Sequence, residues 1–250
     1  LQTILVRWAA KMNVEIVCFC FMCNHFHIIA RFPRGNMSLF MQNIQSDFAD
    51  LINRTRRWED GKRRSGSLFA GRFRYEPLLD DAALLDKVAY VLNNPVEANL
   101  VSRPSNWFEE STSYHATAST GRIEVDWVNR TRLAQLRRSD PDRPAADATR
   151  TYELELVLPP QFTEDSPEAG RRELLEYVEE HRQRLLGDRP PRCHGFLGKK
   201  GVLRIDWWEY PDEPADTPAP LCLTTQSSLR REYRDMRRRV TTDYRKAHQR

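Results

Sequence analysis

The chain has 250 residues, which fits one large domain or two small ones. Charged residues make up 30% and hydrophobic residues 40%, a balance typical of a folded soluble protein that excludes a disordered chain. No apolar stretch reaches the ~18 residues of a membrane span, so we expect no membrane partner. The five cysteines are an odd number, which favours a reducing compartment over a disulfide framework.

An apolar segment over residues 14–23 leads into two histidines, His25 and His27. It is rich in β-branched and aromatic residues, which predicts a strand, and strand residues two apart point to the same face. Both imidazoles would then leave one side of the strand, in a metal-binding geometry. Asn24 is interpreted as the tip of a hairpin. The alternative is a pair of core or edge histidines that only share a face.

A structural zinc site is a second interpretation of this segment. Cys20, Cys23, His25 and His27 lie within eight residues, and structural zinc takes four tetrahedral sulfur and nitrogen ligands. The simpler alternative for these cysteines is small apolar filling of the sheet.

The segment from 54 to 74 is strongly basic. Its positive residues are Arg54, Arg56, Arg57, Lys62, Arg63, Arg64, Arg72 and Arg74, against only two acids. The aromatic residues Trp58, Phe69, Phe73 and Tyr75 are interleaved with or flank them. Proteins that bind single strands combine cations along the backbone with rings that stack on bases, so the segment is a candidate DNA channel. A solvated basic loop is the alternative.

A helix is predicted from Asp80 or Asp81 to about Pro95. Apolar residues at 84, 85, 88, 89 and 92 have helical spacing, an aspartate can cap the start, and the residue before proline disfavours helical torsions. Tyr90 and Asn94 are four residues apart and so lie on one face of this helix. Taken alone, Tyr90 could equally be a half-buried aromatic residue with a satisfied hydroxyl.

Two motifs of the chain resemble those of a known family and occur in the same order. Residues 23–29, Cys-Asn-His-Phe-His-Ile-Ile, resemble the NHxHxx signature of the HUH-type single-tyrosine transposases, the IS200-like transposases. Residues 90–101, Tyr-Val-Leu-Asn-Asn-Pro-Val-Glu-Ala-Asn-Leu-Val, resemble their YxxxNPVxAgLV signature, most closely that of the REP-associated tyrosine transposases. Similar residues at 68–74, 107–108 and 113–114 extend the resemblance over roughly residues 1–116.

The resemblance implies an α+β fold: an antiparallel sheet with helices packed on it, the HUH endonuclease or ferredoxin-like core. It implies that His25, His27 and Asn94 hold a divalent cation, Mg²⁺ or Mn²⁺. It implies that Tyr90 attacks a phosphodiester of single-stranded or hairpin DNA and keeps the 5′ phosphate. A protein of this kind is expected to be cytoplasmic and nucleoid-associated, and to act as a monomer or homodimer.

The chemistry of these residue types agrees with that expectation. A phenol with a reference pKa near 10 is a poor nucleophile at neutral pH and needs a metal or base beside it. Imidazole and amide ligands suit Mg²⁺ or Mn²⁺ better than thiolates would. Lys87, one turn before Tyr90, could lower the pKa of the phenol or contact phosphate. It could also be an ordinary solvated lysine.

The family normally places a strand and a loop before the region that matches residues 1–13. Leu1 is not a start methionine, so we expect the chain to begin inside a longer protein. If the strand is missing from the whole protein, the sheet has lost a member and activity is in doubt.

The second half of the chain carries weaker signals. We predict a core over 1–136, a linker rich in Pro, Asp and Ala over 137–149, and an accessory region over 150–250 that is mostly helical and ends in a basic helix. Helices are predicted over 168–186, closed by Gly187, and over 227–250. The glycine-rich turn over 193–201 lacks the spacing of a P-loop, and Cys193 with His194 is too little for a metal site.

Two classes of function remain open. The first is an enzyme that nicks and joins single-stranded DNA. The second is a catalytically silent DNA-binding relative, domesticated or truncated. Completeness of the set of two histidines, tyrosine and asparagine favours the enzyme, whereas the missing first strand favours the silent relative.

Overall fold

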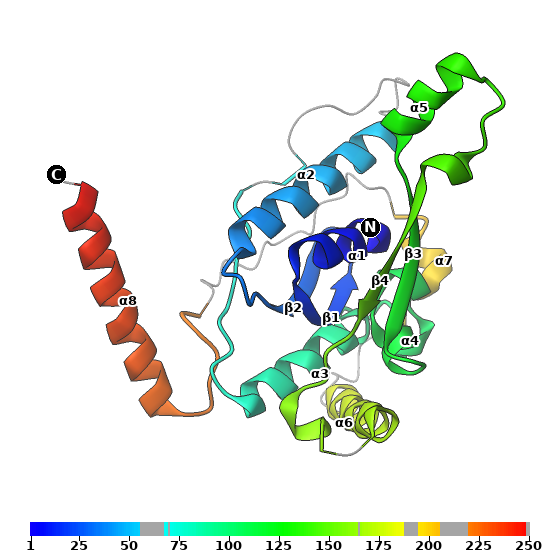
Figure 1. Ribbon diagram of the computed structural model, residues 1–250. Helices are drawn as coiled ribbons and strands as arrows, with labels where there is room; N and C mark the ends of the chain where they lie inside the picture. Colours follow the sequence, from blue (N-terminus) through cyan, green and yellow to red (C-terminus); the bar gives the residue numbers. More distant parts are fainter. Residues whose placement is uncertain (56–67, 70, 165, 188–194, 206–219, 249–250) are drawn as a thin grey trace.

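The computed structural model describes residues 1–55, 68–69, 71–164, 166–187, 195–205 and 220–248. Within this part the fold is α+β, as expected, but the antiparallel sheet is divided into two two-stranded sheets, β1–β2 and β3–β4 (Figure 1). The helices are α1 (Gln2–Met12), α2 (Met37–Thr55), α3 (Asp81–Glu97), α4 (Tyr114–Thr117), α5 (Arg130–Ser139), α6 (Pro167–Gly187), α7 (Gly198–Val202) and α8 (Ser227–His248). The strands are β1 (Glu15–Phe21), β2 (Phe26–Arg31), β3 (Arg122–Val128) and β4 (Thr149–Glu155).

The hairpin formed by β1 and β2 lies between two hydrophobic cores. Phe19 and Phe21 belong to the core that β1 shares with α1, α2 and the second sheet. Val17, Cys18 and Cys20 belong to the core that β1 shares with α3 and α6. The register of β1 against β2 shifts between Ile16 and Cys18, which is a bulge. Alternation along a strand sends successive side chains to opposite faces, so β1 is buried on both sides.

The edge of β1 that faces away from β2 is also paired. The Ser113 N–H donates to the Phe19 carbonyl at 3.0 Å, and the Phe19 N–H donates to the Ser113 hydroxyl at 3.0 Å. The Val157 N–H donates to the Ile16 carbonyl at 2.8 Å, just after β4 ends. These bonds connect β1 to both halves of the chain and leave little of its edge unpaired.

Helix α3 begins as the sequence predicts but ends later. The Asp80 carboxylate accepts from the Ala83 N–H at 2.7 Å, which is an N-cap. We expected the helix to end at Pro95, and this is wrong, because α3 continues to Glu97. Proline removes one hydrogen bond near the end of the helix. The last turn is still closed by the Ala98 N–H on the Asn94 carbonyl at 3.0 Å.

Helix α6 packs along α3 through a buried polar contact. The side chain of Asn93 is fully buried, donates to the Val178 carbonyl at 2.8 Å, and lies 3.4 Å from Nδ1 of His181. Leu174 and Val178 complete the apolar part of this contact. The helix predicted over 168–186 is therefore confirmed, and it supports the helix that carries Tyr90.

The predicted boundary at 137–149 falls between two strands that pair with each other. Strands β3 and β4 are antiparallel over their whole length, from Arg122 opposite Glu155 to Val128 opposite Thr149. Helix α5 and the 3-10 helix Ala145–Ala148 connect them. Residues 149–155 therefore complete a sheet that begins in the first half of the chain, and the domain division itself stays a prediction.

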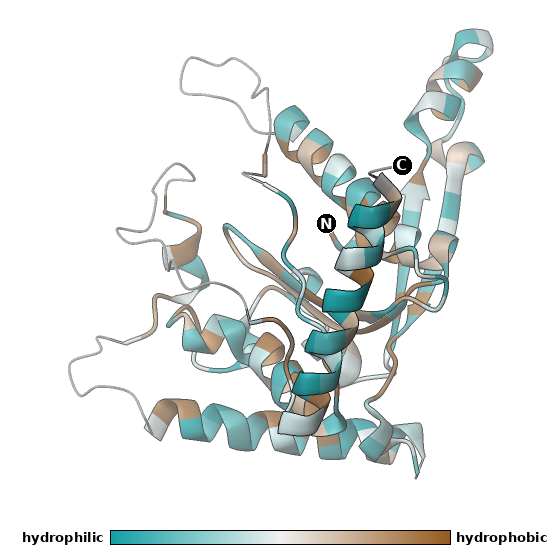
Figure 2. Cartoon of the chain, turned by 90° about the vertical axis from the view of Figure 1, so that its left-hand side faces the viewer, coloured by the Kyte–Doolittle hydropathy of each residue, from teal (hydrophilic) through white to brown (hydrophobic). Residues whose placement is uncertain are grey.

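The C-terminal region is helical and basic, and α8 projects away from the rest of the molecule (Figure 1). Its surface is mostly hydrophilic (Figure 2). Asp80 fastens the segment before α8, because its second carboxylate oxygen accepts from the Thr224 hydroxyl at 2.5 Å and the Thr225 N–H at 2.7 Å. No helix in the described ranges is long and apolar enough to cross a membrane.

We predict that Asn93→Ala lowers the free energy of unfolding by about 1–2 kcal/mol, because it removes a hydrogen bond and leaves a cavity in a buried site. Denaturant unfolding measures the change. Gln183→Ala, which truncates an exposed residue of α6, is the matched control and should stay within about 0.5 kcal/mol of the wild type. Equal stability of the Asn93 variant and the control would show that this contact does not hold α6 on α3.

Candidate active site

The hairpin turn brings the two histidines together. His27 lies in β2 opposite Cys20, and His25 immediately precedes β2, with its carbonyl accepting from the Met22 N–H at 2.9 Å. Residues 23 and 24 form the bend of the hairpin, as expected for Asn24. The two imidazole centroids are 5.0 Å apart, so both side chains occupy one side of the hairpin.

Helix α3 places Tyr90 and Asn94 against this pair of histidines. The ring centroids of Tyr90 and His27 are 5.6 Å apart. Asn94 is 5% exposed and lies one turn further along the helix, close enough to His25 and Tyr90 to shift the pKa of each. The structure therefore brings together, from two separate elements, the four residues that the motifs single out.

Two polar atoms at the centre of this cluster lack partners. Within the described part of the chain, neither Nε2 of His27 nor Oδ1 of Asn94 has a hydrogen-bond partner, and both atoms are buried. Buried polar atoms are almost always satisfied, and exceptions call for an explanation such as an ion. An imidazole nitrogen and an amide oxygen are both metal ligands, so these residues fit a divalent cation.

The surroundings keep the histidines neutral. Burial lowers the pKa of His27 to about 4, helped by the charges of His25 and Lys87. Burial also lowers the pKa of His25, while the nearby Asn94 side chain acts in the opposite direction. The neutral imidazole is the form that binds metals, so a cation would meet little competition from protons at neutral pH.

The same surroundings disfavour the ionised form of Tyr90. Burial raises the pKa of the phenol, and the carboxylates of Glu97 and Glu76 raise it further, whereas Asn94 lowers it. Neither glutamate was singled out from the sequence. Glu97 is seven residues after Tyr90, a helical spacing that could have indicated it. Glu76 precedes the helix and carries no such signal.

Lys87 lies beside the tyrosine ring and is ion-paired. Its Nζ is 3.1 Å from Oε2 of Glu76 and 4.5 Å from the centroid of the Tyr90 ring. The Lys87 side chain is 27% exposed, so it is less solvated than an ordinary surface lysine. Lys87 is therefore a cation in contact with the ring of Tyr90.

The alternative zinc site does not form. Among the described residues, no group of three or more His, Cys, Asp or Glu side chains converges to hold a metal. The thiol of Cys20 lies 3.8 Å from the sulfur of Met22, and burial raises its pKa to about 12. Cys23 is exposed in the hairpin turn. Cys18 and Cys20 fill the apolar core, as the simpler interpretation expected.

The structure describes only part of the predicted basic segment. Arg54, in the last turn of α2, is ion-paired with Asp50. Arg72 and Arg74 are exposed. Outside the described residues lie Arg56, Arg57, Trp58, Lys62, Arg63 and Arg64, together with Cys193 and His194.

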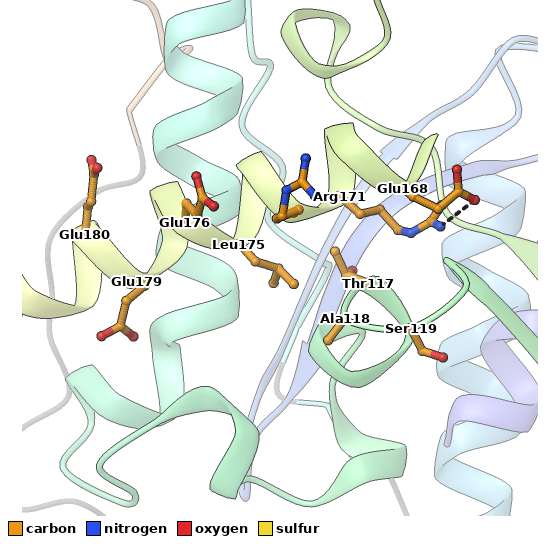
Figure 3. A pocket seen from close by; sticks show the side chains of 10 residues that line it. Thr117, Ala118, Ser119, Glu168, Arg171, Leu175, Glu176, Glu179 and Glu180 are labelled. Atoms are coloured by element: carbon orange, nitrogen blue, oxygen red, sulfur yellow. Dashed lines mark hydrogen bonds and ion pairs between the residues drawn. The ribbon is translucent and has the colours of Figure 1, made fainter. Parts of the chain in front are cut away.

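A large cavity lies elsewhere and has the wrong charge for DNA. It measures about 670 Å³ and lies between α4 and α6 (Figure 3). Its lining includes Glu168, Glu176, Glu179 and Glu180, against two arginines. Arg182 holds the pKa of Glu179 down at about 2. Carboxylates repel phosphate, so this cavity does not extend the candidate site.

Comparison with known proteins finds a family model that matches the first part of the chain. The family model described as transposase IS200-like matches residues 1–94, a span that contains both histidines and Tyr90 and ends at Asn94. This confirms the resemblance seen in the motifs, while residues 95–101 of the second motif lie outside the match. Searches of the curated proteins and of the solved structures each return no match.

We predict that Mn²⁺ binds the wild-type protein and binds the double variant His25→Ala/His27→Ala weakly or not at all, because two nitrogen ligands are lost. Asn94→Ala should weaken binding. Isothermal titration calorimetry measures each affinity. His115→Ala is the matched control, because the Nε2 atom of His115 is also buried without a partner, but this residue lies outside the cluster.

One result would contradict this interpretation of the site. If the protein bound stoichiometric zinc that required Cys20 and Cys23, and if Asn94→Ala had no effect, the metal would belong to a structural site that differs from the described arrangement.

Proposed function

We propose that the transposase IS200-like domain of residues 1–94, with the turn of α3 that follows it, nicks and rejoins single-stranded DNA through Tyr90. One observation carries the proposal. A β-hairpin and a helix, far apart in sequence, converge to put a tyrosine beside two neutral histidines and an amide, with two buried ligand atoms unpartnered.

In the proposed reaction the Tyr90 oxygen attacks a phosphorus atom of the DNA backbone. A bond forms between this oxygen and phosphorus, and the bond from phosphorus to the 3′ oxygen breaks. The phenol loses its proton, and the 3′ oxygen leaves as a hydroxyl. The 5′ phosphate stays on Tyr90 until a 3′ hydroxyl attacks the same phosphorus. This attack rejoins the DNA strand and releases the phenol of Tyr90.

His25, His27 and Asn94 would hold the divalent cation, Mg²⁺ or Mn²⁺. When bound, such a cation stabilises charge on the phosphoryl oxygens and helps align the attack. The protein keeps the two imidazoles neutral by burial and holds them on one side of the β1–β2 hairpin. Positions that three protein ligands leave open would be available to the substrate.

Lys87 would contact a phosphate of the DNA beside Tyr90. In the described structure its charge is shared with Glu76 at 3.1 Å. An incoming phosphate would compete with Glu76 for the ammonium group, and loss of that glutamate contact would place the positive charge nearer the reaction. The two acids that raise the pKa of Tyr90 would then be offset by cations when DNA is bound.

The substrate would be single-stranded or hairpin DNA, because a tyrosine on a packed helix reaches a phosphate more readily where duplex stacking does not hold it away. The exposed Arg72 and Arg74 precede the Tyr90 helix and would follow the strand. We propose the HUH endonuclease type of core for residues 1–136, with 150–250 as an accessory region. We also propose a nucleoid-associated protein that acts as a monomer or homodimer.

A catalytically silent DNA-binding relative is the second candidate. The raised pKa of Tyr90, caused by burial and two nearby carboxylates, is the observation that favours it. The test of Tyr90 below separates the two candidates, because a silent relative binds DNA without forming a covalent adduct.

We predict that Tyr90→Phe abolishes the covalent protein–DNA adduct and leaves DNA binding within about a factor of two, because phenylalanine keeps the packing of the ring and removes only the hydroxyl. Denaturing gels of labelled single-stranded DNA incubated with Mn²⁺ measure the adduct. Tyr114→Phe, another partly buried tyrosine whose pKa is raised, is the matched control. Adduct formation by the Tyr90 variant would move the nucleophile elsewhere, with Tyr233 and Tyr244 of α8 as candidates.

We predict that Arg72→Ala/Arg74→Ala flattens the slope of log affinity against log salt by about 1.4, because each phosphate contact to a single strand contributes about 0.7. Filter binding or fluorescence anisotropy over a range of salt concentrations measures the slope. Arg245→Ala/Lys246→Ala removes the same charge from α8 and should flatten it less. Tighter binding to duplex than to single strands would contradict the proposed substrate.

A further inference from the structure

A second cavity is basic and lined by aromatic residues. It measures about 300 Å³, at the lower end of the range for ligand pockets, and lies between α1, the β3–β4 sheet and α5. Its lining includes Arg7, Lys11, Trp127, Arg132, Arg150 and Tyr152. These residues come from both halves of the chain, so the cavity exists only because β4 pairs with β3 beside α1.

Arg7 is the buried part of this cavity. It is 8% exposed, forms an ion pair with Asp47, and lies with its guanidinium carbon 3.8 Å from the centroid of the Trp127 ring. Its Nε has no hydrogen-bond partner within the described part of the chain. A buried guanidinium with an unused donor is costly for folding alone, which suggests a ligand in this cavity.

The rest of the lining carries an excess of positive charge. Lys11, Arg132 and Arg150 are exposed, and none of them forms an ion pair with another described residue. The only carboxylate of the lining, Asp147, accepts from Nε of Arg143 at 2.5 Å. Lys11, Arg132 and Arg150 therefore have no anionic partner among the described residues.

We propose that this cavity binds one nucleotide of single-stranded DNA. The backbone phosphate would lie among Lys11, Arg132 and Arg150, and the sugar or base would lie against the partly buried Trp127. Cations that follow the backbone, combined with rings that contact bases, are how single-strand sites are built. Arginine also pairs with phosphate through two donors, which suits Arg132 and Arg150.

The cavity and the proposed cleavage site lie on opposite sides of the β1–β2 hairpin. It belongs to the side of the β1–β2 hairpin that packs on α1, whereas Tyr90 and His27 lie on the side that faces α3 (Figure 1). The bound nucleotide would therefore belong to DNA outside the cleaved bond, and the site would select which strand or hairpin reaches Tyr90. This inference rests on the proposed function, because it takes single-stranded DNA to be the substrate.

The test compares two double variants of the full chain that lose the same charge from the same neighbourhood. Arg132→Ala/Arg150→Ala removes two lining cations, and Arg130→Ala/Arg138→Ala removes two exposed cations of α5 that do not line the cavity. Fluorescence anisotropy with labelled oligothymidylate gives the slope of log affinity against log salt. We expect the first variant to flatten it by about 0.7, the contribution of the one phosphate in the cavity, and the control to leave it unchanged. Equal slopes for the two variants overturn the proposal.

Two further measurements identify the class of ligand and test this proposal separately from the proposed function. Thymidine monophosphate and inorganic phosphate are added as competitors at constant ionic strength. Weak competition by both supports a DNA strand, whereas competition at the affinity of the oligonucleotide shows a site for free nucleotide or phosphate and overturns the proposal.

The covalent adduct is assayed on the same samples. A slope that depends on Arg132 and Arg150, in a protein that forms no adduct, supports the cavity and contradicts only the proposed reaction. Normal adduct formation with an unchanged slope contradicts only the cavity.

Discussion

Burial of β1 on both faces is the constraint on which the rest of the structure depends. One face packs on α1 and α2, and the other packs on α3. Hydrogen bonds from Ser113 and Val157 occupy the edge that β2 does not cover. Because the strand is held on every side, the β2 hairpin cannot shift its register without moving its apolar residues into the wrong core. This fixed register places His27 opposite Tyr90.

The candidate site lacks the positive charge that a reactive phenolate of Tyr90 needs. Burial keeps His25 and His27 neutral and raises the pKa of the Tyr90 phenol. Lys87 forms an ion pair with Glu76, which partly neutralises its positive charge. Each of these features disfavours a reactive phenolate in the protein alone. Under the proposed function, a cation held by the neutral imidazoles would supply positive charge, and a phosphate beside Lys87 would displace Glu76.

Charge divides the surface into regions with different roles. The large cavity between α4 and α6 is lined by glutamates and would repel a DNA strand. The smaller cavity beside α1 and the exposed arginines before α3 carry positive charge and would attract it. A strand guided by these regions would pass from one side of the β1–β2 hairpin to the other. The basic α8 is attached to the start of the Tyr90 helix through Asp80.

The sequence by itself determined the local parts of this protein. It predicted the hairpin turn at Asn24, a cap at Asp80 or Asp81 and the shared helix face of Tyr90 and Asn94, because strand alternation, capping and helical spacing depend on neighbouring residues. Only the tertiary structure decided that α3 passes Pro95 and that Cys20 faces the core instead of a metal. It also decided that β4 returns to β3 and forms the basic cavity. These features come from contacts between residues far apart in the chain, which no local pattern encodes.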